Sequence, residues 1–349
     1  MGRKNKSYRK DLKTQLHDKL TEMLHAGEGT SKKDAVATDT AYDKIFSFNS
    51  YKTYNQQCKA FINWIEQKHP ECTTLKAARR HVNEYLEDRT ENGRNQKGEP
   101  LSAWTIQTEA KALGKLYQIR PDDPNYFHAP KRQREDIKRS RGDAKRDKHF
   151  SEKNNDELVK FAKGTGLRRN ILENLRGRDL YTREQIEQLQ RIYMNPEIHD
   201  TEKDMFLKIS ADALKNFPDQ KYFILSHKDK GGRSRFSPII GPYTKQIVER
   251  MQNTRKDEKV WQHISTAMDV HGYRGDYATA IYKLYARPIE SIPYDGINKG
   301  TGKRFQKDVY TCRKDEKGKK LDKKAMVLAS KALGHNRIEV VANNYIRGL

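Results

Sequence analysis

The apolar residues of this chain recur at helical spacing over most of its length, which favours a mainly helical fold. Over 47–116 the pattern is helical throughout, with a break expected before Pro70 and a polar, glycine-containing loop over 88–100. Ser102 has the chemistry of an N-cap residue and predicts the start of the last helix in this region. Because no strand signal interrupts these helices, we expect a small all-α domain at 41–120.

The period changes once, in the second half of the chain. Residues 222–226 predict a strand, 228–232 a turn with lysines at its tip, and 236–240 a partner strand, which together indicate a β-hairpin. Helical patterns flank this hairpin on both sides, and Gly334 is a suitable residue to end the last helix. We therefore expect a mixed α/β domain at 154–349, in a chain that is mainly α with a small β component.

Two basic segments flank the predicted helical domain. Residues 1–40 begin with a strongly basic run, and leucines spaced four apart predict one amphipathic helix between Tyr8 and His25. We expect this segment to be a basic N-terminal extension. Residues 121–153 combine turn residues with runs of Lys and Arg and predict an exposed basic linker. Two interpretations of the linker stay open: a solvated charged tether, or a strap across a phosphate backbone.

The charge balance points to the class of partner. The chain has 349 residues, with 70 Lys and Arg against 47 Asp and Glu, for a formal charge of +23. This excess favours nucleic acid over an anionic membrane surface, but it does not separate an enzyme from a binding protein. No run of about 18 apolar residues and no secretory signal is present, so we expect a cytoplasmic protein without membrane association. Three cysteines without C-x-x-C spacing predict neither a disulfide framework nor a zinc site.

A few polar residues at the ends of predicted elements could carry chemistry. The glycines at 164–166 and 231–232 fit neither a dinucleotide-binding fingerprint nor a phosphate-binding loop. His271 and Arg274 lie one helical turn apart, so their side chains should project to the same side. His335 follows the predicted helix-ending glycine. Each of these signals is weak by itself, and only their order along the chain is informative.

That ordered set resembles the tyrosine recombinase (phage integrase) family. The most specific match is 331–345, Lys-Ala-Leu-Gly-His-Asn-Arg-Ile-Glu-Val-Val-Ala-Asn-Asn-Tyr, and Thr165-Gly-Leu-Arg168 is similar to the family's first arginine box. The resemblance covers about 155–349, and the helical 45–120 region is similar to the family's core-binding (SAM-like) domain. By position, the resemblance implies six catalytic residues: Arg168, Lys230, His271, Arg274, His335 and the nucleophile Tyr345.

The residue types suit phosphoryl transfer. A tyrosine hydroxyl can attack a phosphodiester if arginines hold the charge that develops on the phosphate oxygens. Lys230 could protonate the leaving 5′ oxygen, although Lys228 on the same turn competes for this role. His271 could accept the tyrosine proton, and His335 could hydrogen-bond the phosphate. A 3′-phosphotyrosyl intermediate would conserve the bond energy, so neither ATP, metal nor another cofactor is expected.

The sequence departs from the family pattern in two informative places. An acidic residue commonly follows the first arginine by three positions, but Ile171 stands there, which leaves the support of Arg168 open. A basic insertion at 287–320 precedes the last helix and could form an added DNA-contacting hairpin.

These observations predict a site-specific recombinase (integrase) that integrates or excises a mobile element. The expected partners are double-stranded DNA attachment sites, a homo-tetramer on DNA, and accessory DNA-bending or directionality proteins, in the cytoplasm and associated with a prokaryotic nucleoid. The alternatives are a topoisomerase IB-like or dimer-resolving activity, and a non-catalytic DNA-binding protein on the same fold. The residues expected to contact DNA are Lys131, Arg132, Arg134, Lys138, Arg139, Arg141, Lys228 and Arg233.

Overall fold

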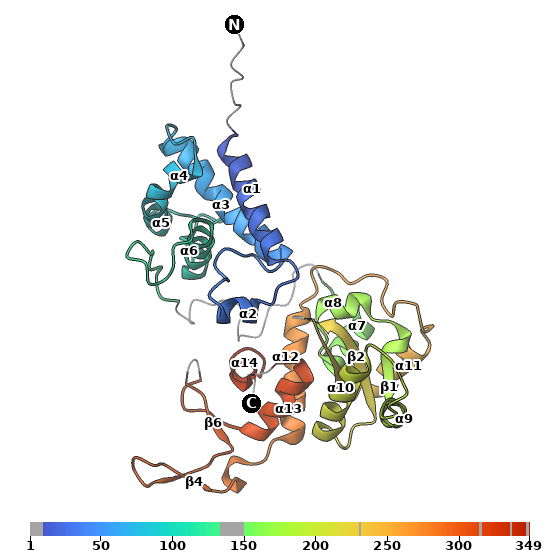
Figure 1. Ribbon diagram of the computed structural model, residues 1–349. Coiled ribbons are helices and arrows are strands. Elements are labelled where there is room, and N and C mark those ends of the chain that lie inside the picture. The colour runs from blue at the N-terminus through green and yellow to red at the C-terminus, as the bar shows by residue number, and fades with distance from the viewer. Residues whose placement is uncertain (1–9, 133–149, 230–231, 314–315, 336, 347–348) are drawn as a thin grey trace. The chain divides into compact units, whose positions relative to one another are not determined.

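The computed structural model describes residues 10–132, 150–229, 232–313, 316–335, 337–346 and 349. The chain divides into two compact units, Met1–Ile137 and Lys138–Leu349, and the division falls within the predicted basic linker (Figure 1). The described residues are mainly helical with small antiparallel sheets, so the predicted fold class is confirmed at this level. No helix in the described part of the chain has the length and apolar character needed to cross a membrane.

The first unit is all helical. Its helices are α1 (Leu12–Gly27), α2 (Lys32–Ala37), α3 (Phe48–Lys68), α4 (Leu75–Ala78), α5 (Val82–Glu91) and α6 (Ala103–Tyr117). The side chain of Ser102 accepts a hydrogen bond from the backbone of Thr105 and caps α6, as predicted. Helix α1 packs against α3 and buries Leu16 and Leu20 in the same core as Phe61. The segment set apart at 1–40 as an extension therefore supplies part of the core of this unit.

The second unit contains eight helices and seven strands within its described residues. The helices are α7 (Asp156–Thr165), α8 (Arg169–Asn174), α9 (Arg183–Tyr193), α10 (Lys203–Asn216), α11 (Thr244–Gln252), α12 (Val270–Tyr285), α13 (Lys323–Leu333) and α14 (Ile338–Asn344). The strands are β1 (Leu180–Thr182), β2 (Tyr222–Asp229), β3 (Arg233–Pro238), β4 (Gly296–Ile297), β5 (Arg304–Phe305), β6 (Val309–Thr311) and β7 (Lys320–Asp322).

The predicted hairpin is present as β2 and β3, and β1 adds a third antiparallel strand beside β2. The pairing of β2 with β3 is shifted between Ser226 and Asp229, which is a β-bulge near the hairpin tip. The basic insertion at 287–320 contains the β4–β5 hairpin, and β6 pairs with β7 just before α13. A hairpin was expected in this insertion, whereas β1 and the β6–β7 pair were not predicted, because three residues are too few to show a strand period.

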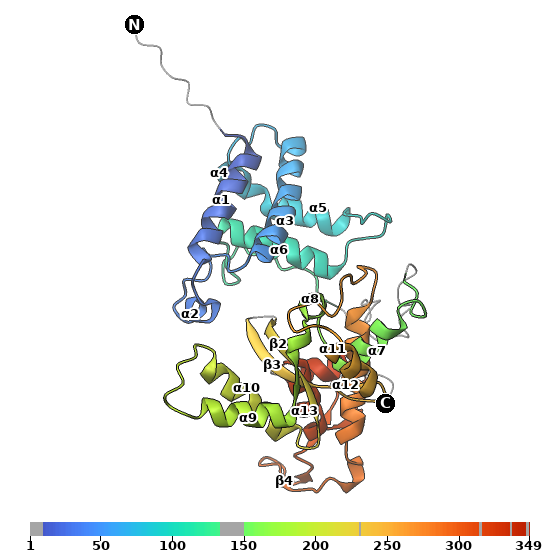
Figure 2. The same ribbon diagram turned by 90° about the vertical axis from the view of Figure 1, so that its right-hand side faces the viewer.

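Helix α12 connects the two buried cores of this unit. Near its start Tyr273 packs with α7, α8 and α11, whereas Tyr277 and Ile281 pack with β2, β3, α10, α13 and α14. Helices α12 and α13 lie side by side in both views (Figures 1 and 2). The first turns of α12 are therefore held on several sides, which fixes the backbone that carries His271 and Arg274.

A tight turn after α7 positions the first arginine. Gly166 ends α7 with φ of +57°, and a Cβ atom at this position would overlap the ring of Tyr277. Only glycine combines this left-handed conformation with so close an approach. Two residues later, Arg168 occupies the N-cap position of α8. The glycines at 164–166 therefore mark a break between two helices.

Candidate active site

Five of the six predicted catalytic residues line one cavity of about 770 Å³: Arg168, His271, Arg274, His335 and Tyr345. They come from the N-cap of α8, the first turns of α12, the end of α13 and the end of α14. The sixth residue, Lys230, lies outside the described residues. Arg169, Arg233 and Arg337 also line this cavity, so it is strongly cationic.

Tyr345 lies between the two histidines. It follows α14 as its C-cap residue and is only 5% exposed. The centroid of its ring is 5.0 Å from that of His271 and 5.2 Å from that of His335. The guanidinium carbon of Arg274 lies 5.7 Å from the same ring centroid. Helix α14, which holds this tyrosine in place, was not predicted from the sequence.

Arg274 is a buried arginine that joins two distant parts of the chain. It is 1% exposed, and its two Nη atoms donate to the backbone oxygens of Gly166 and Leu333. Burial lowers the pKa of Arg274 to about 10, and repulsion from Arg235 and Arg168 acts in the same direction. The side chain therefore stays charged at neutral pH. A guanidinium has five N–H groups. Arg274 also forms a side-chain hydrogen bond with Tyr345, and its Nε makes no hydrogen bond with the described residues.

Arg168 is supported by an acidic residue that the sequence reasoning missed. Asp229, at the end of β2, accepts hydrogen bonds on Oδ2 from both Arg168 and Arg235. Asp229 is 4% exposed, whereas Ile171, at the position where the family commonly has an acid, belongs to the apolar core. The carboxylate thus comes from the hairpin and not from α8. One signal was available, because Asp229 lies inside the predicted turn.

Arg235 is the second residue missed. Its Nε donates to the hydroxyl of Ser237 at 3.0 Å, and burial lowers its pKa. One carboxylate therefore pairs with two guanidinium groups beside the cavity. Arg168, Arg235 and Arg274 outnumber the single carboxylate, so this poorly solvated region carries a net positive charge. Such a region suits an anion that accepts hydrogen bonds on two oxygens, such as a phosphodiester.

His335 is held in a neutral state. It follows Gly334, whose φ is +69°, and its Nε2 is buried without a hydrogen-bond partner among the described residues. Burial lowers the pKa of His335 to about 4, and the charges of Arg274, Arg168 and Arg235 add to this effect. At neutral pH the imidazole is therefore uncharged, and it can act as a neutral hydrogen-bonding group toward an anion in the cavity.

We expect the titration of His335 to be visible in the free protein. In ¹⁵N-histidine NMR spectra, one imidazole should remain neutral until the pH approaches about 4, and this signal should be missing in His335→Gln. The unfolded histidine binds its proton near pH 6.5, so stability is lost as the pH falls from about 6.5 toward 4. His335→Gln should lose less stability over this range. A His335 signal that titrates above pH 6 would contradict the buried environment described here.

The residues expected to contact DNA fall into three groups. Lys131 and Arg132 are exposed, and the guanidinium of Arg132 lies over the ring of Trp104 at 5.1 Å. Lys228 is exposed at the β-bulge with φ of +41°, and Arg233 is exposed at the cavity. The remaining predicted residues lie outside the described residues: Arg134, Lys138, Arg139 and Arg141.

Neither a protein-family model nor a curated protein matches this chain.

Proposed function

We propose that the chain is a site-specific DNA strand transferase of the tyrosine recombinase type. One observation carries this proposal: a tyrosine near the end of the chain lies between two histidines and beside a buried arginine, in a cavity that a second arginine also lines. Neither the cationic cavity nor the tyrosine alone would favour strand transfer over simple DNA binding. Their combination places a nucleophile next to a phosphate-binding site.

The proposed reaction has two balanced steps. The Tyr345 hydroxyl attacks a DNA phosphorus, which forms a tyrosyl–phosphate bond and breaks the bond to the 5′ oxygen. His271 accepts the tyrosine proton, and Lys230 supplies a proton to the 5′ oxygen. Arg168 and Arg274 hold the non-bridging oxygens while negative charge accumulates there. In the second step a 5′ hydroxyl of another strand attacks the same phosphorus and gives its proton to Lys230, while the bond to tyrosine breaks and His271 returns a proton to the phenolic oxygen.

The biological role follows from this chemistry as part of the same proposal. Strand exchange between two duplexes requires two pairs of nucleophiles, so the functional assembly would be a tetramer on double-stranded attachment sites. The formal charge of +23 supports binding to the phosphate backbone. Integration or excision of a mobile element, in the cytoplasm of a prokaryotic host and with accessory DNA-bending or directionality proteins, is the role that we propose.

The decisive experiment traps the covalent intermediate. A binding sequence is first selected from random duplexes with the Tyr345→Phe protein. It is then placed in a duplex with a nick close to the cleavage site. After cleavage, the short fragment that carries the 5′ hydroxyl dissociates, so the strand cannot be rejoined. Wild-type protein should form a protein–DNA adduct that survives detergent, and Tyr345→Phe should form none, because a phenyl ring has no nucleophilic oxygen.

Tyr193→Phe is the matched control for this experiment. The hydroxyl of Tyr193 donates to Asp200 at 2.9 Å, and the residue does not line the cavity. This variant should form the adduct at the wild-type level. No adduct in wild type would overturn the proposal and favour the non-catalytic DNA-binding alternative. An undiminished adduct in Tyr345→Phe would overturn the assignment of Tyr345 as the nucleophile. Relaxation of a plasmid without the selected sequence would instead favour the topoisomerase-like alternative.

A further inference from the structure

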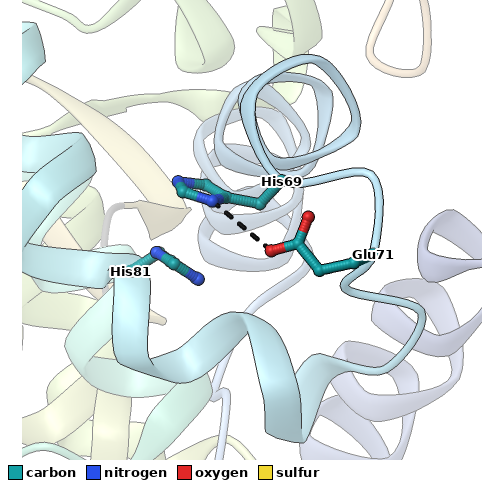
Figure 3. Close-up of side chains that lie close together, drawn as sticks. All are labelled: His69, Glu71 and His81. Atoms are coloured by element: carbon teal, nitrogen blue, oxygen red, sulfur yellow. Dashed lines mark ion pairs between the residues drawn. The ribbon is translucent and has the colours of Figure 1, made fainter.

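A cluster of metal-ligand side chains lies in the first unit. His69 ends α3 as its C-cap residue, Glu71 follows in the loop, and His81 immediately precedes α5. One ligand atom from each of these three residues lies within 4.8 Å of the others. Figure 3 shows the three side chains converging on one place, with the Glu71 carboxylate turned toward His69.

A second carboxylate orients both imidazole rings. Glu84 on α5 approaches His69 Nε2 at 3.2 Å with one oxygen and His81 Nδ1 at 2.7 Å with the other. If those nitrogens carry the protons, His69 Nδ1 and His81 Nε2 keep their lone pairs. One contact agrees with this arrangement for His81: its Nε2 accepts a hydrogen bond from Arg80 at 2.9 Å.

This is the arrangement that metal-binding histidines use. The nitrogen that does not face the metal usually donates to a carboxylate, which fixes the tautomer and the orientation of the ring. Here a single carboxylate does this for both rings. The two rings are stacked with their centroids 3.6 Å apart. Both histidines are largely shielded from solvent, at 19% and 14% side-chain exposure.

We propose that His69, Glu71 and His81 form a binding site for a divalent transition-metal ion, with Zn²⁺ as the best match. Two imidazole nitrogens and one carboxylate oxygen are typical Zn²⁺ ligands, and a water molecule would complete a tetrahedral shell. The bound ion would tie the end of α3 to the start of α5. The sequence-based expectation of no zinc site rested on cysteine spacing, which does not bear on ligands that come from a loop and from the residue before a helix.

Arg80 is the competing cation in the free protein. Its Nε donates to His81, and its Nη2 lies 3.7 Å from a Glu71 oxygen. The guanidinium thus makes a hydrogen bond to one proposed ligand and an ion pair with another. The Arg80 side chain is 66% exposed, so it can move into solvent. Metal binding would displace it into solvent. This feature separates a metal site from a polar cluster that Arg80 completes.

The test measures Zn²⁺ binding by untagged full-length protein in competition with a chromogenic chelator. Wild type should bind one equivalent that His69→Ala and His81→Ala both lose. Glu84→Gln should weaken binding by about 10- to 100-fold, the usual effect of removing such an orienting carboxylate. The control is His25→Ala, which removes an exposed histidine paired with Glu28 at 3.2 Å and should leave binding unchanged.

Arg80→Met distinguishes the two interpretations of the cluster. If the site binds metal, this variant should bind Zn²⁺ more tightly than wild type, because the competing donor is gone. Zn²⁺ should also raise the melting temperature of wild type but not of His81→Ala. Equal binding by wild type and the two histidine variants, or weaker binding by Arg80→Met, would overturn the proposal. Zn²⁺ binding is measured without DNA and without adduct formation, so failure of the metal proposal would not affect the assignment of Tyr345 as the nucleophile.

Discussion

Arg274→Lys should reduce the rate of covalent adduct formation by about 10²- to 10³-fold, the usual effect of removing an electrostatic donor from a transition state. In the structure, Arg274 holds two backbone oxygens and still presents further N–H groups toward the cavity. A lysine has a single ammonium and cannot do both. The measurement is single-turnover adduct formation on the nicked substrate, with DNA binding determined separately.

Arg183→Lys is the control for this substitution. Arg183 also donates to two backbone oxygens, those of Phe217 and Gln220, and it does not line the cavity. The two variants should show similar losses of stability, because each leaves buried carbonyl groups without their donors. Only Arg274→Lys should lose adduct formation. Similar adduct rates in both variants would show that Arg274 has only a structural role.

Asp229→Asn should destabilise the protein by about 3–5 kcal/mol, the range found when one partner of a buried ion pair is removed. The substitution keeps the shape of the side chain but leaves Arg168 and Arg235 facing each other without a negative charge. Repulsion should also displace Arg168 from the cavity and slow adduct formation. Denaturant unfolding gives the free energy, and the nicked substrate gives the rate.

A double-mutant cycle tests whether the pairing itself is responsible. Arg235→Met removes one buried charge, so adding it to Asp229→Asn should restore part of the lost stability. Asp212→Asn provides the comparison, because its carboxylate pairs with Lys331 at 2.7 Å with both side chains about half exposed. This surface pair should contribute about 0–1 kcal/mol. Additive effects of the Asp229 and Arg235 substitutions would contradict the arrangement.

Local signals in the sequence were sufficient for much of the fold. Thr182 and Gln185 have the spacing of a capping box, and their side chains form one at the start of α9. Gly334, the predicted helix-ending glycine, ends α13 in the left-handed conformation. Each of these depends on neighbouring residues only. Proline suits the first turn of a helix, which would start a helix at Pro242, but α11 begins two residues later at Thr244. Helix ends without a specific cap are set by packing, which the sequence does not display.

The site was predictable where order along the chain carried the information. Arg168, His271, Arg274, His335 and Tyr345 could be chosen by their order, and they line one cavity. The order of residues along the chain does not predict the ion pairs around Arg168. Asp229 and Arg235 meet across two strands, and their register depends on a bulge that only the folded hairpin defines.

The turn at Gly166 has a consequence for how this chain can change. One peptide unit ends α7, contacts Tyr277, and accepts the hydrogen bond from Arg274, two residues before Arg168. The backbone at Gly166 therefore determines the distance between Arg168 and Arg274. Residue 166 should therefore tolerate almost no substitution, because a side chain there would overlap Tyr277 and would have to adopt a left-handed backbone conformation.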